Sequence, residues 1–235
     1  MKLFIITFFS VLLSVLCTTA FKFSEYETRN IEGWTVKIAQ QLLTDDRQLA
    51  DRAIDSLNTK LENVKRVIPA KHHQFLQSVP IWLEKSTPGF KGMVYHPSAK
   101  WLANNGYNPD KAKAIEITNA KNFIDWTATQ PWHVLHELSH AYHDRIIGNS
   151  YRPIAKAYDN AVSSSLYQQV SRNRGSKLWE AYAIKNQREY FAELTEAYFG
   201  ENDFYPFNRQ ELKEYDPQGY AAIEEAWQID LAMDN

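Results

Sequence analysis

The sequence predicts an α+β fold in one domain, in which a small mixed sheet packs against several helices. Apolar residues recur at helical spacing in three parts of the chain, at about residues 35–67, 132–147 and 182–199. Short β-rich segments lie between the first two, within residues 79–118. Hydrophobic residues make up 44% of the chain and aromatic residues 14%, which favours a packed core over disorder.

Residues 1–20 have the pattern of a cleaved secretory signal. Lys2 gives a basic start, residues 3–16 form an uncharged apolar run, and residues 18–20 are small enough for cleavage. A membrane anchor is the alternative, but the run is shorter than the ~20 residues that a spanning helix needs. We therefore expect a secreted or periplasmic protein that keeps no membrane attachment after cleavage.

The mature chain, residues 21–235, is expected to be a single domain. Residues 21–78 would form a mainly helical scaffold, and residues 79–200 would hold the sheet and the chemistry-bearing motifs. Cys17 is the only cysteine, so no disulfide can stabilise the mature chain. The formal net charge is -2 with acids and bases interleaved, which argues against nucleic-acid binding. We expect a monomer.

The first long helical pattern, residues 35–67, is expected to form two helices. Thr44, Asp45 and Asp46 resemble a helix start for the second one, and Pro69 follows its end. No residue of this segment suggests chemistry. The adjacent His72 and His73 that follow it point in different directions on any regular element, so we do not expect them to bind one metal ion.

The sheet is expected within residues 79–118. The strand candidates are residues 79–83, 92–96 and 114–118, and a brief helical turn follows Pro97. We interpret His96 as a structural histidine and not as a metal ligand.

The central motif is His136-Glu137-x-x-His140, in a stretch with helical periodicity. Its apolar positions are Val134, Leu135, Leu138, Ala141, Tyr142, Ile146 and Ile147. On a helix, His136 and His140 lie one turn apart on one face and can bind one zinc ion, while Glu137 can contact a water on that ion. The alternative is an amphipathic helix whose histidines are merely polar. Gly148 and Asn149 are a stop signal for the helix.

A third zinc ligand is expected on a second helix, within residues 182–199. Glu189, Glu193 and Glu196 recur at three and four residues, so they can share one face. One carboxylate can bind the metal, and another can hydrogen-bond a ligand histidine. The alternative is an ordinary solvated acidic face. A further helix is expected at residues 152–170, followed by a loop at residues 171–176. Residues 209–228 are also expected to be helical, with Asp216-Pro217 beginning the last helix.

These motifs resemble the gluzincin metallopeptidases, over about residues 110–200. The closest likeness is to the catalytic domain of anthrax lethal factor and to the Pro-Pro endopeptidases. The resemblance implies a zincin-like fold and implies that Glu189 is the zinc ligand, that Glu193 supports the site and that Tyr182 faces the metal. One departure is Ser139, where the lethal-factor relatives often have Gly.

The resemblance also implies a place for the substrate backbone. Residues 114–118 resemble the edge strand of gluzincins, which pairs with an extended peptide, and Asn119-Ala120 matches the dipeptide that follows that strand. Asn119 and Ala120 are thus candidate substrate-binding residues. An Asn that merely ends a strand is the alternative.

The predicted function is a zinc-dependent endopeptidase acting on a peptide or protein substrate, with residues 79–200 as its catalytic core. His136, His140 and Glu189 would hold Zn²⁺, and Glu137 would take the proton of a metal-bound water. Tyr182 would stabilise the oxyanion. The alternatives are a secreted zinc-holding binding protein, such as an inactive peptidase homologue, and a hydrolase of non-peptide amides.

Overall fold

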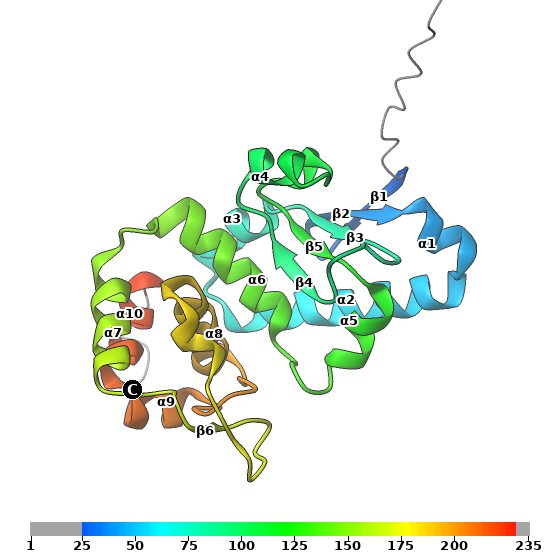
Figure 1. Cartoon of the computed structure of the whole chain (residues 1–235). Helices are drawn as coiled ribbons and strands as arrows, with labels where there is room; N and C mark the ends of the chain where they lie inside the picture. Colours follow the sequence, from blue (N-terminus) through cyan, green and yellow to red (C-terminus); the bar gives the residue numbers. More distant parts are fainter. Residues whose placement is uncertain (1–24, 229–235) are drawn as a thin grey trace, which may run out of the picture.

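A computed structural model describes residues 25–228, and the predicted signal at residues 1–20 lies outside them (Figure 1). The main sheet has five strands in the order β1-β2-β3-β5-β4. Strands β2, β3 and β5 run parallel, whereas β1 and β4 pair antiparallel at the two edges. Their bounds are β1 Tyr26–Ile31, β2 Trp34–Ala39, β3 Ile81–Leu83, β4 Met93–Tyr95 and β5 Ile115–Ile117. A small hairpin adds β6 Val170–Ser171 and β7 Leu178–Trp179.

Helices make up most of the remaining described chain. The α-helices are α1 Gln40–Asp45, α2 Arg47–Val67, α3 His73–Gln77, α4 Ala99–Asn104, α5 Ala120–Trp126, α6 His133–Tyr142, α7 Arg152–Ser163, α8 Gln187–Phe199, α9 Arg209–Tyr215 and α10 Pro217–Ala226. Three 3-10 turns and one π-helical segment join them: η1 Ala70–His72, η2 Pro109–Lys111, η4 Tyr182–Lys185 and the π-helix η3 His143–Ile147. None of the helices between residues 25 and 228 has the length and apolar character needed to span a bilayer. The prediction of a mixed α+β fold with a small mixed sheet and several helices is confirmed.

The start of the first predicted helix is wrong, because β2 occupies Trp34–Ala39. Trp34, Val36 and Ile38 are buried and alternate with more exposed residues, which is the period of a strand. The two helices that follow agree with the prediction, and Asp46 caps α2 by accepting the backbone N–H of Leu49 at 3.0 Å. The sheet therefore begins well before residue 79, and the segment expected to be mainly helical scaffold contributes two strands.

The sheet has one apolar face and one polar buried face. Side chains alternate along a strand, so Ile115 and Ile117 of β5 join the hydrophobic core while Glu116 points the other way. On that polar face the carboxylate of Glu116 accepts hydrogen bonds from Lys111 at 2.6 Å and contacts His96 at 2.6 Å. His96 thus has a buried carboxylate partner, as expected for a structural histidine.

Helix α6 lies between the sheet and the C-terminal helices (Figure 1). It packs against β4 and α2 on one side and against α8 on the other. Three parallel aromatic rings join α6, α8 and the residue after α10. Trp227 stacks on Tyr142 with centroids 4.1 Å apart and on Phe191 at 6.0 Å. This aromatic stack holds α6 and α8 in one fixed arrangement.

Of the two other predicted helical stretches, the first is shorter than expected and the second agrees with the prediction. The helix predicted over residues 152–170 ends at Ser163, and the chain then forms the β6–β7 hairpin around the predicted loop. The helical stretch predicted over residues 209–228 contains α9 and α10. Asp216 begins α10 as predicted, because its side chain caps that helix by accepting the N–H of Gly219 at 2.9 Å. The apolar periodicity alone does not reveal that α7 ends at Ser163.

The aromatic stack makes a testable contribution to stability. Trp227 is fully buried and its indole N–H donates to the hydroxyl of Thr195 at 3.1 Å. We expect Trp227→Ala to lower the free energy of unfolding by about 3–5 kcal/mol, because it leaves a large cavity. Denaturant unfolding measures this loss. Trp101→Ala is the matched control, because Trp101 is 49% exposed and its loss should cost under about 1 kcal/mol. Equal losses in the two variants would contradict this role of the stack.

Candidate metal centre

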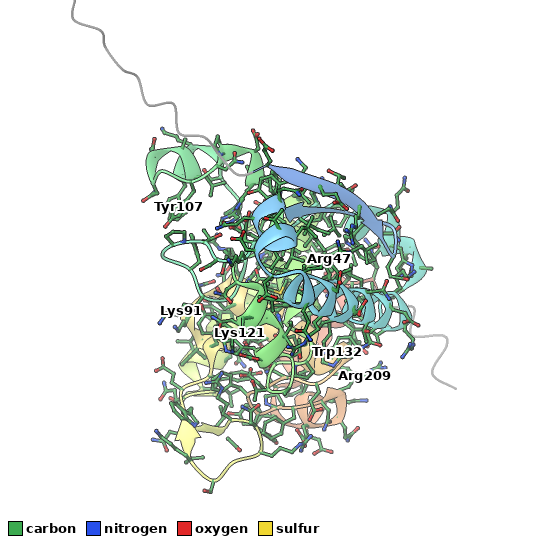
Figure 2. The ribbon with its side chains drawn as sticks, turned by 90° about the vertical axis from the view of Figure 1, so that its right-hand side faces the viewer. Arg47, Lys91, Tyr107, Lys121, Trp132 and Arg209 are labelled. Atoms are coloured by element: carbon green, nitrogen blue, oxygen red, sulfur yellow. The ribbon has the colours of Figure 1, made fainter. Side chains whose placement is uncertain are left out.

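The two histidines of the central motif lie on α6 with their ring centroids 4.7 Å apart. Their position depends on how closely α6 approaches α8. Trp132, labelled in Figure 2, precedes α6, and its indole lies against Gly200 at the end of α8: a Cβ on Gly200 would be 2.2–2.4 Å from that ring. Glycine is therefore required at this contact between the two helices.

The third residue of the cluster, Glu189, comes from the first turn of α8. Its place is set by Asn186, whose side-chain oxygen accepts the backbone N–H groups of Arg188 at 3.0 Å and Glu189 at 3.1 Å. Sequence analysis did not single out Asn186. The signal was available, because Asn directly before an apolar-periodic segment is a common N-cap.

His136, His140 and Glu189 converge on one point. The Nε2 atoms of both histidines lie 3.1 Å from Oε2 of Glu189, and the three candidate ligand atoms all lie within 4.8 Å of one another. A tetrahedral zinc ion with bonds of about 2.0–2.1 Å separates its ligand atoms by roughly 3.3 Å. Two imidazoles and one carboxylate at this spacing fit Zn²⁺, and three protein ligands leave a fourth position for water.

The carboxylate that hydrogen-bonds His136 is Glu196, whereas sequence analysis gave the supporting role to Glu193. Nδ1 of His136 lies 2.7 Å from Oε1 of Glu196 but 3.9 Å from Oε1 of Glu193. The bond to Glu196 fixes the tautomer of His136, because a proton on Nδ1 leaves Nε2 free to bind a metal. Both carboxylates are buried, so neither belongs to a solvated acidic face.

The charges of the cluster favour a bound cation. Burial lowers the pKa of His136, but hydrogen bonds with Glu189 and Glu196 outweigh it and raise the pKa well above its ordinary value of 6.5. Burial raises the pKa of Glu189, but hydrogen bonds with His136 and His140 outweigh it and hold the pKa well below 4.5. The same attraction that holds a proton here would hold a metal ion in its place.

Glu137 lies beside the cluster and is held by the sheet. Its Oε2 accepts the backbone N–H of Tyr95 at 2.7 Å, so the edge strand β4 fixes one oxygen of the carboxylate. Burial of Glu137 is nearly complete, at 8% exposed. The other oxygen is left to exchange a proton with a group bound at the cluster.

The prediction that residues 114–118 form an edge strand is wrong. Strand β5 lies between β3 and β4 and is paired on both sides, so it cannot accept a further strand. Ala120 is fully buried, and the side chain of Asn119 caps α5 by accepting the N–H of Asn122 at 2.9 Å. Neither residue lines the cavities beside the cluster. The prediction failed because the order of strands in the sheet makes β5 internal, and a local sequence motif does not determine that order.

Tyr182 lies at the start of η4 and is 40% exposed. Burial of the ring and the negative charge of Glu189 raise the pKa of Tyr182 above 10.0. The phenol therefore stays protonated at neutral pH and can donate a hydrogen bond into the cavities that it lines.

Two cavities meet at the cluster, of about 320 Å³ and about 350 Å³. The residues that line both are Met93, His136, Glu137 and Tyr182. The first cavity continues toward Pro97 and Arg188, and the second toward Trp126 and Phe204. An extended molecule can therefore pass across the cluster with a part in each cavity.

Comparison with known protein families matches residues 98–226 to the family described as anthrax toxin lethal factor, N- and C-terminal domain. The match covers more than half of the 235-residue chain. No curated protein and no solved structure matches it.

At Ser139, the departure noted in the motif, the buried hydroxyl donates to the carbonyl of Leu135 at 2.7 Å.

The difference between Glu193 and Glu196 can be tested by metal affinity. We expect Glu196→Ala to weaken zinc binding about 10–100-fold, because His136 loses the acceptor that orients it. The loss of zinc affinity in Glu193→Ala should be several-fold smaller than the loss in Glu196→Ala. Competition with a chromophoric chelator measures both constants, with circular dichroism to check folding. A larger loss in the Glu193 variant would return the supporting role to that residue.

Proposed function

The chain belongs to the anthrax toxin lethal factor family, and from this membership and the geometry of the cluster we propose that it is a zinc-dependent endopeptidase. Within that proposal it has a zincin-like fold and belongs with the gluzincins, together with lethal factor and the Pro-Pro endopeptidases. The observation that carries the proposal is the convergence of His136, His140 and Glu189, with the carboxylate of Glu137 beside them. The signal-like pattern of residues 1–20 supports the further proposal that the enzyme is secreted or periplasmic.

His136, His140 and Glu189 hold the metal in this proposal. When bound, zinc lowers the pKa of a water toward about 7 and polarises the carbonyl of the scissile bond. The buried position of Glu196 keeps His136 in the tautomer that can bind. The cap at Asn186 keeps Glu189 in line with the two imidazoles.

Glu137 acts as general base and then as general acid. Its Oε1 takes the proton of the attacking water while Oε2 stays hydrogen-bonded to Tyr95, so the carboxylate keeps its orientation as its charge changes. It then passes the proton to the leaving amine. Tyr182 donates its phenolic hydrogen bond to the carbonyl oxygen as negative charge develops there.

The substrate backbone pairs with β4 in this proposal. Gly92 accepts the N–H of Thr118, and His96 donates to the carbonyl of Ala114, so these residues face β5. Because backbone groups alternate in direction along a strand, the N–H and C=O of Met93 point to the free edge, as does the N–H that Tyr95 donates to Glu137. Met93 can therefore bind an extended peptide by strand addition and place its carbonyl at the cluster.

The roles of Glu137 and Glu189 can be separated by two substitutions. We expect Glu137→Ala to lower kcat/KM for peptide cleavage by about 10²–10⁴-fold and to leave zinc content unchanged, because the residue moves protons and binds no metal. Glu189→Ala should lose zinc and activity together. Cleavage of a peptide library followed by mass spectrometry, with zinc measured by atomic absorption, tests both. Unchanged zinc affinity in the Glu189 variant would remove it from the ligand set.

Tyr182→Phe tests oxyanion stabilisation. Because the ring stays and only the hydroxyl is lost, we expect kcat to fall about 10–10³-fold while KM changes little. Steady-state kinetics on a cleaved peptide measures the two constants. Tyr107→Phe is the control, because Tyr107 lines neither cavity beside the cluster. A fall in substrate affinity with unchanged kcat would assign Tyr182 to binding alone.

A further inference from the structure

The cavity of about 350 Å³ beside the candidate metal cluster is lined by both aromatic and acidic side chains, and we call it the acidic cavity. Its walls are Gly92, Met93, Trp126, Gln130, His133, Arg172 and Phe204. Its acidic residues beyond Glu137 are Glu193, Glu196 and Asp203. All three carboxylates are at most 6% exposed. Buried carboxylates need partners, so the partner of each one decides what the cavity can bind.

Two of these carboxylates are already engaged. Glu196 lies 2.7 Å from Nδ1 of His136, and Asp203 accepts a hydrogen bond from Nε of Arg172 at 2.9 Å. Arg172 is held further by its position over the ring of Phe204, 4.9 Å from the centroid. The guanidinium is thus committed to Asp203 and does not neutralise a second carboxylate.

Glu193 is the carboxylate that remains. Its Oε1 lies 3.9 Å from Nδ1 of His136, and its Oε2 has no hydrogen-bond partner among residues 25–228. Glu193 is 4% exposed and lines the acidic cavity. Because Glu196 already orients His136, the metal cluster does not require Glu193. A carboxylate in this position is satisfied best by a cation that enters the cavity.

The walls suit a cation on a long aliphatic stem. Trp126 lines the cavity and is 37% exposed overall. It lies so close to Gly92 that a Cβ on Gly92 would be 2.7 Å from its ring. Phe204 contributes a second aromatic ring. Methylene groups pack against such rings while a terminal charge reaches past them to a carboxylate. Burial lowers the pKa of His133 to about 4, so this wall residue adds no positive charge at neutral pH.

The direction of β4 decides which substrate residue enters the acidic cavity. The cavity lies at the start of β4, at Gly92 and Met93, whereas the first cavity extends past its end to Pro97. Antiparallel pairing is the commoner arrangement for an added strand, and it places the C-terminal part of a peptide at the start of β4. The acidic cavity is then on the side of the residue that follows the scissile bond.

We propose that the acidic cavity binds the side chain of a lysine or arginine that directly follows the scissile bond, with Glu193 as the carboxylate that selects it. This proposal rests on the proposed endopeptidase function and adds a substrate class to it. The enzyme then cleaves on the amino side of basic residues. Glu193 acts on specificity and is separate from the residues that carry out hydrolysis.

The test uses matched peptides after a library has located the cuts. We expect Lys or Arg after the bond at most cut sites, and a kcat/KM at least about tenfold higher for Arg than for citrulline, its uncharged isostere, in one peptide sequence. Glu193→Gln should reduce this ratio to about threefold or less, with zinc content unchanged. Glu201→Gln is the control, since Glu201 is 55% exposed and pairs with Arg174, and it should keep the full ratio.

Several outcomes would overturn the proposal. These are cut sites with no basic residue after the bond, an Arg-to-citrulline ratio unchanged in Glu193→Gln, and a second zinc equivalent that is lost in Glu193→Gln, which would make the carboxylate a metal ligand. If no peptide is cut, the proposed function fails separately. Calorimetry with arginine amide and citrulline amide then tests the cavity: tighter binding of arginine amide that depends on Glu193 supports it, and equal binding overturns it.

Discussion

The packing of α6 against α8 is the constraint on which the candidate site depends. Metal ligands must lie within a few tenths of an ångström of ideal distances, and here two candidate ligands come from one helix and the third from another. The stack of Tyr142, Trp227 and Phe191 joins the end of α6 to the start of α8. The contact of Trp132 with Gly200 joins the start of α6 to the end of α8. The bond from His136 to Glu196 joins the helices between these contacts. The three contacts together act as a rigid frame around the cluster.

The same packing explains why α8 can carry three acidic residues on an otherwise buried helix. An unpaired carboxylate in the interior is destabilising, so each of them needs a partner that the neighbouring elements supply. The carboxylate of Glu189 contacts both histidines, and the carboxylate of Glu196 hydrogen-bonds Nδ1 of His136. Glu193 is left with an oxygen that has no hydrogen-bond partner among residues 25–228, which is a cost to stability that the proposed role in binding would explain. Local violations of burial rules of this kind are expected at functional sites.

Sequence alone was sufficient where the information was local. The pair His136 and His140 follows from the period of a helix. Helical spacing left Glu189, Glu193 and Glu196 open as the third candidate ligand, and the resemblance to the gluzincins selected Glu189. The features that the sequence did not predict depend on contacts between distant parts of the chain. The choice between Glu193 and Glu196 depends on the rotation of α8 against α6, because both are within one turn of the required place. The strand β2 was read as helix because its period of two lasts only six residues before a true helix begins.

Strand order has the largest consequence among these non-local features. The chain makes β3, then β4, then β5, but β5 inserts between the other two, so that β4 becomes the edge. A motif that follows a strand in sequence, as Asn119 follows β5, says nothing about whether that strand is exposed. Because β4 is the edge, its N–H groups alternate between β5 and the site, and one of them holds Glu137. The antiparallel edge therefore fixes the carboxylate of Glu137 and, under the proposed function, would set the direction in which a peptide crosses the cluster. Both proposed roles thus depend on the same three residues of β4.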